Sequence, residues 1–481
     1  MNRYIGIKTF LVLSVSLLFF GCAGGIGNSL GNFGKSSNFQ GETQSMDYKT
    51  LAKKYHDENK TGDLLWDYEA GTVNSYIKDY KFSNHYFDIA ENLIKKYDEE
   101  VLGSKVAANV GSLLSNDTFM DYRPKIYEKI MLNTLKGINF INLNDQQNAR
   151  VEFNRALVRQ QRAKVFFEKE IAKTKEDIKK EQKEKLKKEG KKINDSVYDK
   201  AANSKEANDE IEKKYSNLFA FKPYPDFVNP FTTYMAALYF YNVKDYRKAS
   251  DLFKETYGMI KGLDDGAKYV KKDWILALKA KSSGAFRKKH FVWVIFLNGE
   301  GPFKDELKID IPLFLLTDDL DYTGIALPTL KFRDKACKSL KISNLKKSVE
   351  TKKVASMDRV VKTEFKKRFP SVVTRAIFRT VTQTVLQKQI KDKTKSMGTF
   401  GLIARIAGSV YQFSMNRADT RIWNTLPKEF QTARIKTGKS AVIYAGEKKI
   451  ADIKTNPHKN YMIFVRIPTK KSEPVISYVS F

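Results

Sequence analysis

Cysteine and histidine are scarce in this chain, which holds two cysteines and four histidines among 481 residues. Two cysteines allow at most one disulfide, so a scaffold held by several disulfides is excluded. The histidines are too far apart in sequence to bind a metal ion from one helix, as a His-x-x-x-His pair does. They are His56, His85, His290 and His458. We therefore predict no metal site and no cofactor.

Short motifs that mark nucleotide-binding sites are also missing. The sequence has no Walker A loop and no G-x-G-x-x-G fingerprint. One glycine-rich loop, Asn298-Gly299-Glu300-Gly301-Pro302, is interpreted as a hairpin turn, because no helix follows whose N-terminus could bind an anion. The sequence shows no cluster of titratable residues either, so we predict that the protein is not an enzyme.

Long apolar runs are absent beyond the N-terminus, since no later stretch approaches the roughly 20 residues that span a bilayer. A shorter run, Thr9–Phe20, follows the basic Arg3 and Lys8 and has the length of the apolar part of a signal peptide. It ends in Leu18-Phe19-Phe20-Gly21-Cys22, which resembles a lipobox. We predict a lipoprotein signal peptide over residues 1–21 and a lipid, with acyl chains such as palmitate, on Cys22. A plain secretory signal with a chance cysteine is the alternative.

A lipid on Cys22 would leave Cys337 as the one free thiol and rule out an internal disulfide. Residues 22–46 are rich in Gly, Ser and Asn and are predicted to form a flexible tether. Ala23 rather than Asp follows the lipidated cysteine, which favours the outer membrane over retention at the inner one. The expected location is therefore the cell envelope of a bacterium, anchored by lipid and facing the periplasm.

Positive charge dominates, with 86 Lys and Arg against 55 Asp and Glu and a net charge of +31. Such an excess is typical of nucleic-acid binding, but an exported protein does not meet nucleic acid, so we predict none as partner. Anionic lipid headgroups or acidic wall polymers are the expected partners of this charge. The most basic stretch is 331–380, and its helix is predicted to be a core helix, with a helix lying on the membrane surface as the alternative.

Residues 47–285 carry apolar side chains at helical spacing and contain a degenerate repeat. A small residue is followed 12 positions later by a second one, then four later by Phe, then three later by another small residue. The three copies are Gly71, Ser83, Phe87 and Ala90; Gly137, Ala149, Phe153 and Ala156; and Ala237, Ala249, Phe253 and Thr256. These offsets are typical of tetratricopeptide (TPR) repeats, in which small residues let two helices approach and Phe fills the gap. A generic antiparallel helical bundle is the alternative.

Residues 160–215 are crowded with Lys and Glu and are predicted to form a charged helical arm. Ile171, Ile178 and Leu186 lie about a heptad apart, as in a coiled coil that receives a partner. Three positions make only a short seam, so a solvated helical hairpin with ion pairs between successive turns is favoured.

Residues 286–481 are predicted to form a β-rich α+β domain. Apolar or alternating runs predict strands near 291–297, 307–311, 322–332, 441–444, 449–453, 461–467 and 475–479. Helices are expected at 358–392 and 399–417. The predicted fold class is thus α+β, with an N-terminal TPR-like all-α domain over 47–285 followed by a β-rich C-terminal domain with inserted helices.

Four segments carry a resemblance to known proteins: Asn148–Glu152, Asp245–Phe253, Val294–Pro312 and Ala418–Pro427. Together they resemble a family of functionally unassigned bacterial envelope lipoproteins in which TPR-like helices precede a mixed α/β domain. The resemblance covers nearly the whole mature chain, and the last segment, Ala-Asp-Thr-Arg-Ile-Trp-Asn-Thr-Leu-Pro, is the most specific. It implies no catalytic residues.

Within that last segment, Asp419 and Arg421 are placed to form an ion pair, and Trp423 is either an interface anchor or a core residue, with the core favoured. The sequence predicts a lipid-anchored cell-envelope protein that acts as a protein-interaction scaffold through TPR-like helices and binds an envelope protein. The alternative is an envelope enzyme, or a direct activator of an enzyme that acts on peptidoglycan.

Overall fold

The computed structural model describes residues 47–103, 121–189, 204–225, 227–312, 322–344, 347–394 and 417–481. In these ranges helices come first and a β-rich part follows, which confirms the α+β class. No helix in them is long and apolar enough to cross a membrane. The predicted signal peptide, Cys22, the whole of the tether and most of the expected helix at 399–417 lie outside the described residues.

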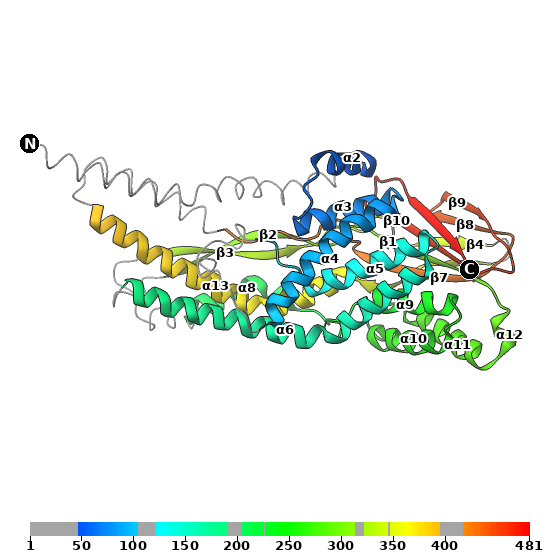
Figure 1. Ribbon diagram of the computed structural model, residues 1–481, viewed down its shortest axis with the longest axis horizontal. Coiled ribbons are helices and arrows are strands. Elements are labelled where there is room, and N and C mark those ends of the chain that lie inside the picture. The colour runs from blue at the N-terminus through cyan, green and yellow to red at the C-terminus, as the bar shows by residue number, and fades with distance from the viewer. Residues whose placement is uncertain are drawn as a thin grey trace, which may run out of the picture.

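The described residues form eleven helices, most of them in the first part of the chain (Figure 1). They are α2 (Tyr48–Glu58), α3 (Leu64–Tyr76), α4 (Tyr80–Leu102), α5 (Ile126–Asn142), α6 (Gln146–Glu189), α8 (Lys205–Phe219), α9 (Pro230–Asn242), α10 (Tyr246–Ile260), α11 (Ala267–Ser282), α12 (Gly284–Arg287) and α13 (Met357–Thr394). The inserted helix expected at 358–392 is therefore confirmed as α13.

Three helix pairs, α3–α4, α5–α6 and α9–α10, turn in the same way. Each turn has one residue with positive φ followed by an Asp, whose N–H donates at 2.9 Å to the carbonyl five residues before it. The Asp side chain then accepts from an N–H three residues later, which caps the second helix. The residues in question are Lys78-Asp79, Asn144-Asp145 and Lys244-Asp245. The same local chemistry thus recurs at three places far apart in the sequence.

Close packing of a glycine against a phenylalanine occurs in two of these pairs. A Cβ atom on Gly71 would lie 2.5 Å from the ring of Phe87, and one on Gly137 would lie 2.9 Å from that of Phe153. The third pair has Ala237 and Phe253 at the corresponding positions, both fully buried or nearly so. The Phe ring therefore lies in the space that the missing Cβ leaves.

Replacing Gly71 by alanine is expected to lower the free energy of unfolding by about 1–3 kcal/mol, because the new Cβ overlaps the Phe87 ring. The matched control is Gly258→Ala in α10, where a Cβ would meet nothing within 4 Å. At this position alanine is expected to raise the free energy of unfolding by about 0.5–1 kcal/mol, because alanine has a higher helix propensity than glycine. Denaturant unfolding of both variants measures the difference. Equal effects at the two sites would contradict the close packing.

The strands in the part of the chain that the structure describes form three sheets. The five-stranded sheet has the order β11-β10-β1-β7-β6, the four-stranded sheet the order β5-β4-β8-β9, and β2 pairs with β3 alone. Only β1 and β10 run parallel; all other pairs are antiparallel. The strands are β1 (Phe291–Asn298), β2 (Phe303–Pro312), β3 (Tyr322–Lys331), β4 (Leu340–Ser343), β5 (Ser348–Glu350), β6 (Lys352–Ser356), β7 (Glu429–Lys436), β8 (Ser440–Ala445), β9 (Lys448–Lys454), β10 (Tyr461–Ile467) and β11 (Val475–Ser480). The seven expected strand regions are confirmed, whereas β4 to β7 were not expected.

The hairpin turn predicted at Asn298–Pro302 is wrong. The strand before this loop pairs with β10 and β7, and the strand after it pairs with β3, so the loop leads from one sheet to another. The N–H of Gly299 donates to the carbonyl of Ile467 (2.9 Å), and that of Gly301 to the carbonyl of Leu426 (2.7 Å). Hydrogen bonds to these distant partners fix the loop in a conformation that is not a hairpin turn. A local turn signal in the sequence does not predict such partners.

One hydrophobic core joins the helical and β-rich parts. Alternate residues of β1 point to opposite sides of the sheet: Trp293 and Ile295 pack with the helices, whereas Val292 and Val294 pack against the four-stranded sheet. Across the helical side, the ring of Phe231 in α9 stacks on that of Phe430 in β7, with centroids 3.6 Å apart. The change from helix to strand near residue 285 is therefore not a boundary between two separate cores.

A second, smaller core lies where α8, the β2–β3 hairpin and α13 run beside one another (Figure 1). The Tyr215 hydroxyl of α8 donates to the Pro328 carbonyl (2.9 Å), and its ring packs on Phe369 of α13. Within the predicted arm at 160–215, Ala207, Ile211 and Tyr215 of α8 are therefore buried in this core and not solvated. The apolar side of the β2–β3 hairpin would otherwise be exposed to water, and α8 and α13 pack over it.

Candidate functional site

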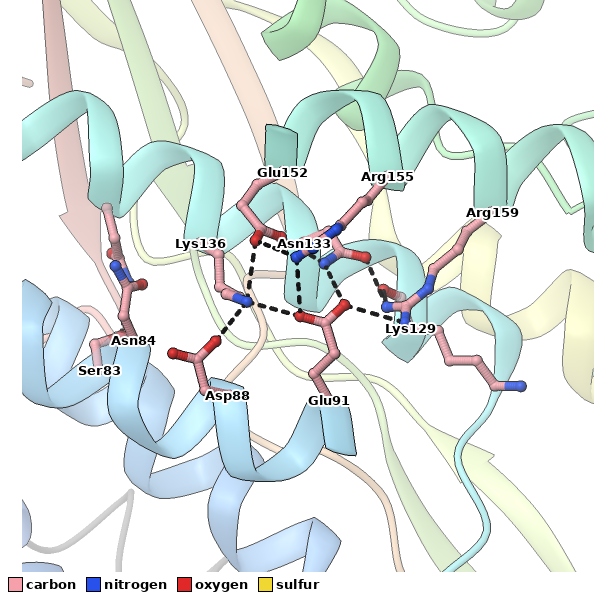
Figure 2. Close-up of polar contacts among 11 residues, drawn as sticks. Ser83, Asn84, Asp88, Glu91, Lys129, Asn133, Lys136, Glu152, Arg155 and Arg159 are labelled. Atoms are coloured by element: carbon pink, nitrogen blue, oxygen red, sulfur yellow. Dashed lines mark hydrogen bonds and ion pairs between the residues drawn. The ribbon is translucent and has the colours of Figure 1, made fainter. Parts of the chain in front are cut away.

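A cluster of buried charges ties α4, α5 and α6 together (Figure 2). Lys136 of α5 is 2% exposed, and its Nζ lies 2.7 Å from a carboxylate oxygen of Asp88, 2.7 Å from Glu91 and 3.1 Å from Glu152. Asn133, one turn earlier, donates to Glu91 (3.1 Å) and to Glu152 (2.6 Å). The two buried glutamates are thus each bound by both an ammonium and an amide.

Two arginines of α6 complete this cluster. Arg155 lies 2.9 Å from Glu152, and Arg159 lies 3.2 Å from Glu91. Burial raises the pKa of Glu91, but Lys136 and Arg159 more than offset this and lower it to about 2. Glu91 is therefore ionised at neutral pH. Asp88 and Arg155 are about half exposed, so one side of the cluster reaches the surface.

The segment Ala418–Pro427 is bound to α3. The Trp423 ring stacks on that of Tyr68 with centroids 4.2 Å apart, and its Nε1 donates to the Thr72 hydroxyl (2.9 Å). Glu69 accepts from the N–H groups of Asn424 (2.6 Å) and Thr425 (3.2 Å). Burial raises the pKa of Glu69 to about 7, although these hydrogen bonds act in the opposite direction.

Trp423 is 1% exposed and belongs to the main core, so the structure places it where the core interpretation expects it and not at a free surface. Asp419 and Arg421 form an ion pair, with Nε 2.9 Å from Oδ1, and the Asp419 carboxylate also accepts the N–H of Arg421 (3.0 Å). This pair fixes the chain just before Trp423 reaches α3.

A cavity of about 140 Å³ lies between α6, α13 and the β2–β3 hairpin, next to the segments 123–127 and 417–419. Its charged lining residues are mostly basic. They are Arg123, Lys125, Lys304, Arg368, Arg375, Arg379 and Arg417, with Glu170, Glu364 and Asp419 as the acids. Arg375 and Arg379, which lie four residues apart on α13, both line it.

The three carboxylates of this cavity are each paired with an arginine. The Nη1 and Nη2 atoms of Arg368 donate to Glu170, at 2.9 and 2.8 Å, and its Nε donates to Glu364 at 2.7 Å. Asp419 is paired with Arg421. Burial raises the pKa of Glu170, but Arg368 outweighs it and brings the pKa to about 2.

The two lysines of the cavity have no such partner. Lys125 Nζ donates to the carbonyl of Arg123 (3.1 Å), and Lys304 Nζ to that of Arg421 (3.0 Å). Burial lowers the pKa of both, that of Lys125 to about 8. The sequence analysis missed these lysines because they lie in a loop and a strand nearly 180 residues apart, and no motif marks them.

Among the described residues, no three His, Cys, Asp or Glu side chains are grouped closely enough to hold a metal ion. Comparisons with protein-family models, with curated proteins and with solved structures found no match to this chain. The contacts described above are therefore the observations that bear on function.

Proposed function

We propose that this chain is a lipid-anchored protein of the bacterial cell envelope that binds an envelope protein through its TPR-like helix pairs. The observation that carries the proposal is the recurrence of one turn geometry and one small-residue packing in three helix pairs. Such arrays present a rigid surface, so little conformational entropy is lost when a partner binds. The resemblance of the sequence to envelope lipoproteins with TPR-like helices supports the same function.

The contact surface that we propose is a row of exposed valines on α6. Val151, Val158 and Val165 are 41%, 43% and 57% exposed. A spacing of seven residues, nearly two helical turns, keeps them on one side of the helix. Exposed apolar side chains in a row are typical of a surface that another protein covers.

The alternative of an envelope enzyme gains no support from the carboxyl groups of the cavity. A carboxyl group acts best as a general acid or base when its pKa lies near the working pH. Arg368 instead holds Glu170 ionised. Burial raises the pKa of Asp419, but Arg421 and nearby lysines outweigh it and hold that pKa well below its usual range. We therefore keep the binding function as the proposal.

Replacing Cys22 by serine is expected to release the protein from the membrane fraction or leave its signal peptide uncleaved, because the thiol that carries the lipid is gone. Fractionation of cells, with immunoblotting for size and location, measures this. Cys337→Ser is the matched control and should leave both unchanged. A Cys22→Ser protein that is processed normally and stays on the membrane would contradict the lipid anchor.

A photo-crosslinking residue at position 158 is expected to capture one envelope protein in living cells, because Val158 lies at the centre of the exposed row on α6. The matched control is the same residue at position 478, since Tyr478 on β11 is also exposed, at 55%, but is far from α6 in sequence. Mass spectrometry of the crosslinked products identifies the partner. Equal capture at both positions, or none at 158, would count against this surface.

A further inference from the structure

We infer that the cavity between α6, α13 and the β2–β3 hairpin is a binding site for a phosphate group. The source of that group is a small phosphorylated solute or the headgroup of an anionic lipid. This site is separate from the valine row on α6, so the inference goes beyond the proposed protein binding and does not rest on it.

The charge of the cavity wall supports an anionic ligand. Seven lining residues are Lys or Arg and three are Asp or Glu, which leaves a surplus of four positive charges. Arg368 and Arg421 contact the three carboxylates at hydrogen-bond distance, and Asp419 also attracts Lys125 and Lys304. By the count of charged lining residues, the wall as a whole is still net positive.

Lys125 and Lys304 are the two groups that most need a ligand. Among the described residues no carboxylate lies within ion-pair distance of either ammonium, and each donates to a backbone carbonyl instead. An ammonium has three N–H donors, so each retains donors for a ligand. Burial lowers the pKa of Lys125, and repulsion from the positive charges of Lys304 and Arg368 lowers it further. An anion between the two lysines would relieve that repulsion.

The size and walls of the cavity match a phosphate group attached to a small apolar part. Its volume of about 140 Å³ exceeds the roughly 30 Å³ that one water molecule takes up in the liquid. Val361, Phe365 and Ala376 of α13 and Pro328 of β3 supply apolar wall beside the charged groups. A doubly charged phosphate uses a surplus of several cations better than a carboxylate does, and both ammonium and guanidinium groups bind phosphate well.

The position of the cavity explains why these residues meet. It lies where the main core ends and the second core begins, since Val361 belongs to the first and Ala376 to the second. Arg368 lies between them on α13 and is held by Glu170 of α6 and Glu364. The helices and strands of the wall are therefore packed against one of the two cores on each side of the cavity. Such packing fixes the positions of the lining side chains and so preorganises a site.

The test uses the full-length mature protein in neutral detergent. Titration calorimetry with inorganic phosphate, and separately with pyrophosphate, is carried out against chloride at equal ionic strength. We expect binding to the wild type, and an affinity at least tenfold weaker for both Lys125→Met and Lys304→Met. Lys125→Arg and Lys304→Arg keep the positive charge and should restore most of the affinity. Lys448→Met, which removes an exposed lysine paired with Glu473, is the matched control and should bind as the wild type does.

Short-chain phosphatidylglycerol, kept below the concentration at which it forms micelles, distinguishes the two sources. If it competes with phosphate and loses affinity in both methionine variants, the ligand is a lipid headgroup; if phosphate binds and the lipid does not compete, the ligand is a soluble phosphate. Circular dichroism and thermal unfolding show whether each variant is folded. The inference is overturned if folded wild-type protein binds none of the three probes, or if both methionine variants bind them as tightly as the wild type. Loss of protein capture at position 158 would leave these results unchanged.

Discussion

Replacing Lys136 by methionine is expected to lower the free energy of unfolding by about 3–5 kcal/mol. The ammonium of Lys136 lies within 3.1 Å of Glu91 and Glu152, and both glutamates are buried. Methionine has a similar length but no charge, so it would leave two buried carboxylates with one cation fewer. Removing one partner of a buried ion pair costs far more than the pair itself contributes, because the remaining buried charge is less well compensated. Chemical denaturation at pH 7 measures the effect.

Asp88→Asn is the matched control for this variant. Asp88 also contacts the Lys136 ammonium at 2.7 Å, but its side chain is 61% exposed. Water solvates an exposed carboxylate and screens its interaction, so its loss is expected to change stability by less than about 1 kcal/mol. If Lys136→Met were as mild as Asp88→Asn, the three helices would not depend on the buried cluster.

The same cluster predicts a dependence of stability on pH. Burial raises the pKa of Glu91, but Lys136 and the other cluster members lower it to about 2, below the value near 4.3 in the unfolded chain. Stabilisation from this group is therefore fully present above about pH 4.5 and is lost as the pH falls towards 2. In Lys136→Met the burial remains without the cation, so Glu91 should take up a proton at higher pH. The stability difference between the two proteins is expected to shrink between pH 6 and pH 3.

Replacing Trp423 by alanine is expected to lower the free energy of unfolding by about 3–5 kcal/mol, as for other large buried side chains. The Trp423 ring is 1% exposed, stacks on Tyr68 and contacts the Phe87 ring at a centroid distance of 6.0 Å. Phe87 is the same ring that fills the space beside Gly71. A cavity at Trp423 would therefore loosen both the main core and the first helix pair.

Trp423→Phe separates packing from hydrogen bonding. Phenylalanine can still stack on Tyr68 but cannot donate to Thr72, so a smaller loss of about 1–2 kcal/mol is expected. Thermal and denaturant unfolding of the two variants give the comparison. Similar losses for alanine and phenylalanine would show that the hydrogen bond, rather than the ring, attaches this segment to α3.

Local patterns in the sequence were enough to predict several contacts between neighbouring elements. The offset of 16 residues between Gly71 and Phe87 predicted a glycine facing a ring, and such a contact occurs between α3 and α4. The same kind of contact occurs between Gly137 of α5 and the ring of Phe153 of α6. These contacts join helices that follow each other in the chain, so the spacing along the sequence determines which side chains meet. Strands with alternating or continuous apolar residues, such as β1 and β10, were predictable for the same reason.

Strand β7 shows why other elements escaped prediction. Its sequence, Glu429–Lys436, is largely polar, yet the strand lies in the sheet between β1 and β6. Distant groups satisfy its buried polar side chains: Gln431 donates to the carbonyl of Lys338 (2.9 Å), and Thr432 donates to that of Val294 (3.1 Å). Buried polar side chains are stable only when they have hydrogen-bond partners of this kind. The local sequence pattern does not predict these partners, because they lie in distant segments.

The sequence by itself determined the change from helices to a β-rich part, the offsets between small residues and Phe in the repeat, and the excess of positive charge. It also places a lipobox-like segment at Cys22. Each of these depends on residues close together in the chain. Only the tertiary structure decided that helices and sheets share one core, that α8 covers β2, and that Lys125 and Lys304 line one cavity. Those features depend on contacts between segments that lie about a hundred or more residues apart. The packing of the whole chain decides which of these distant segments meet.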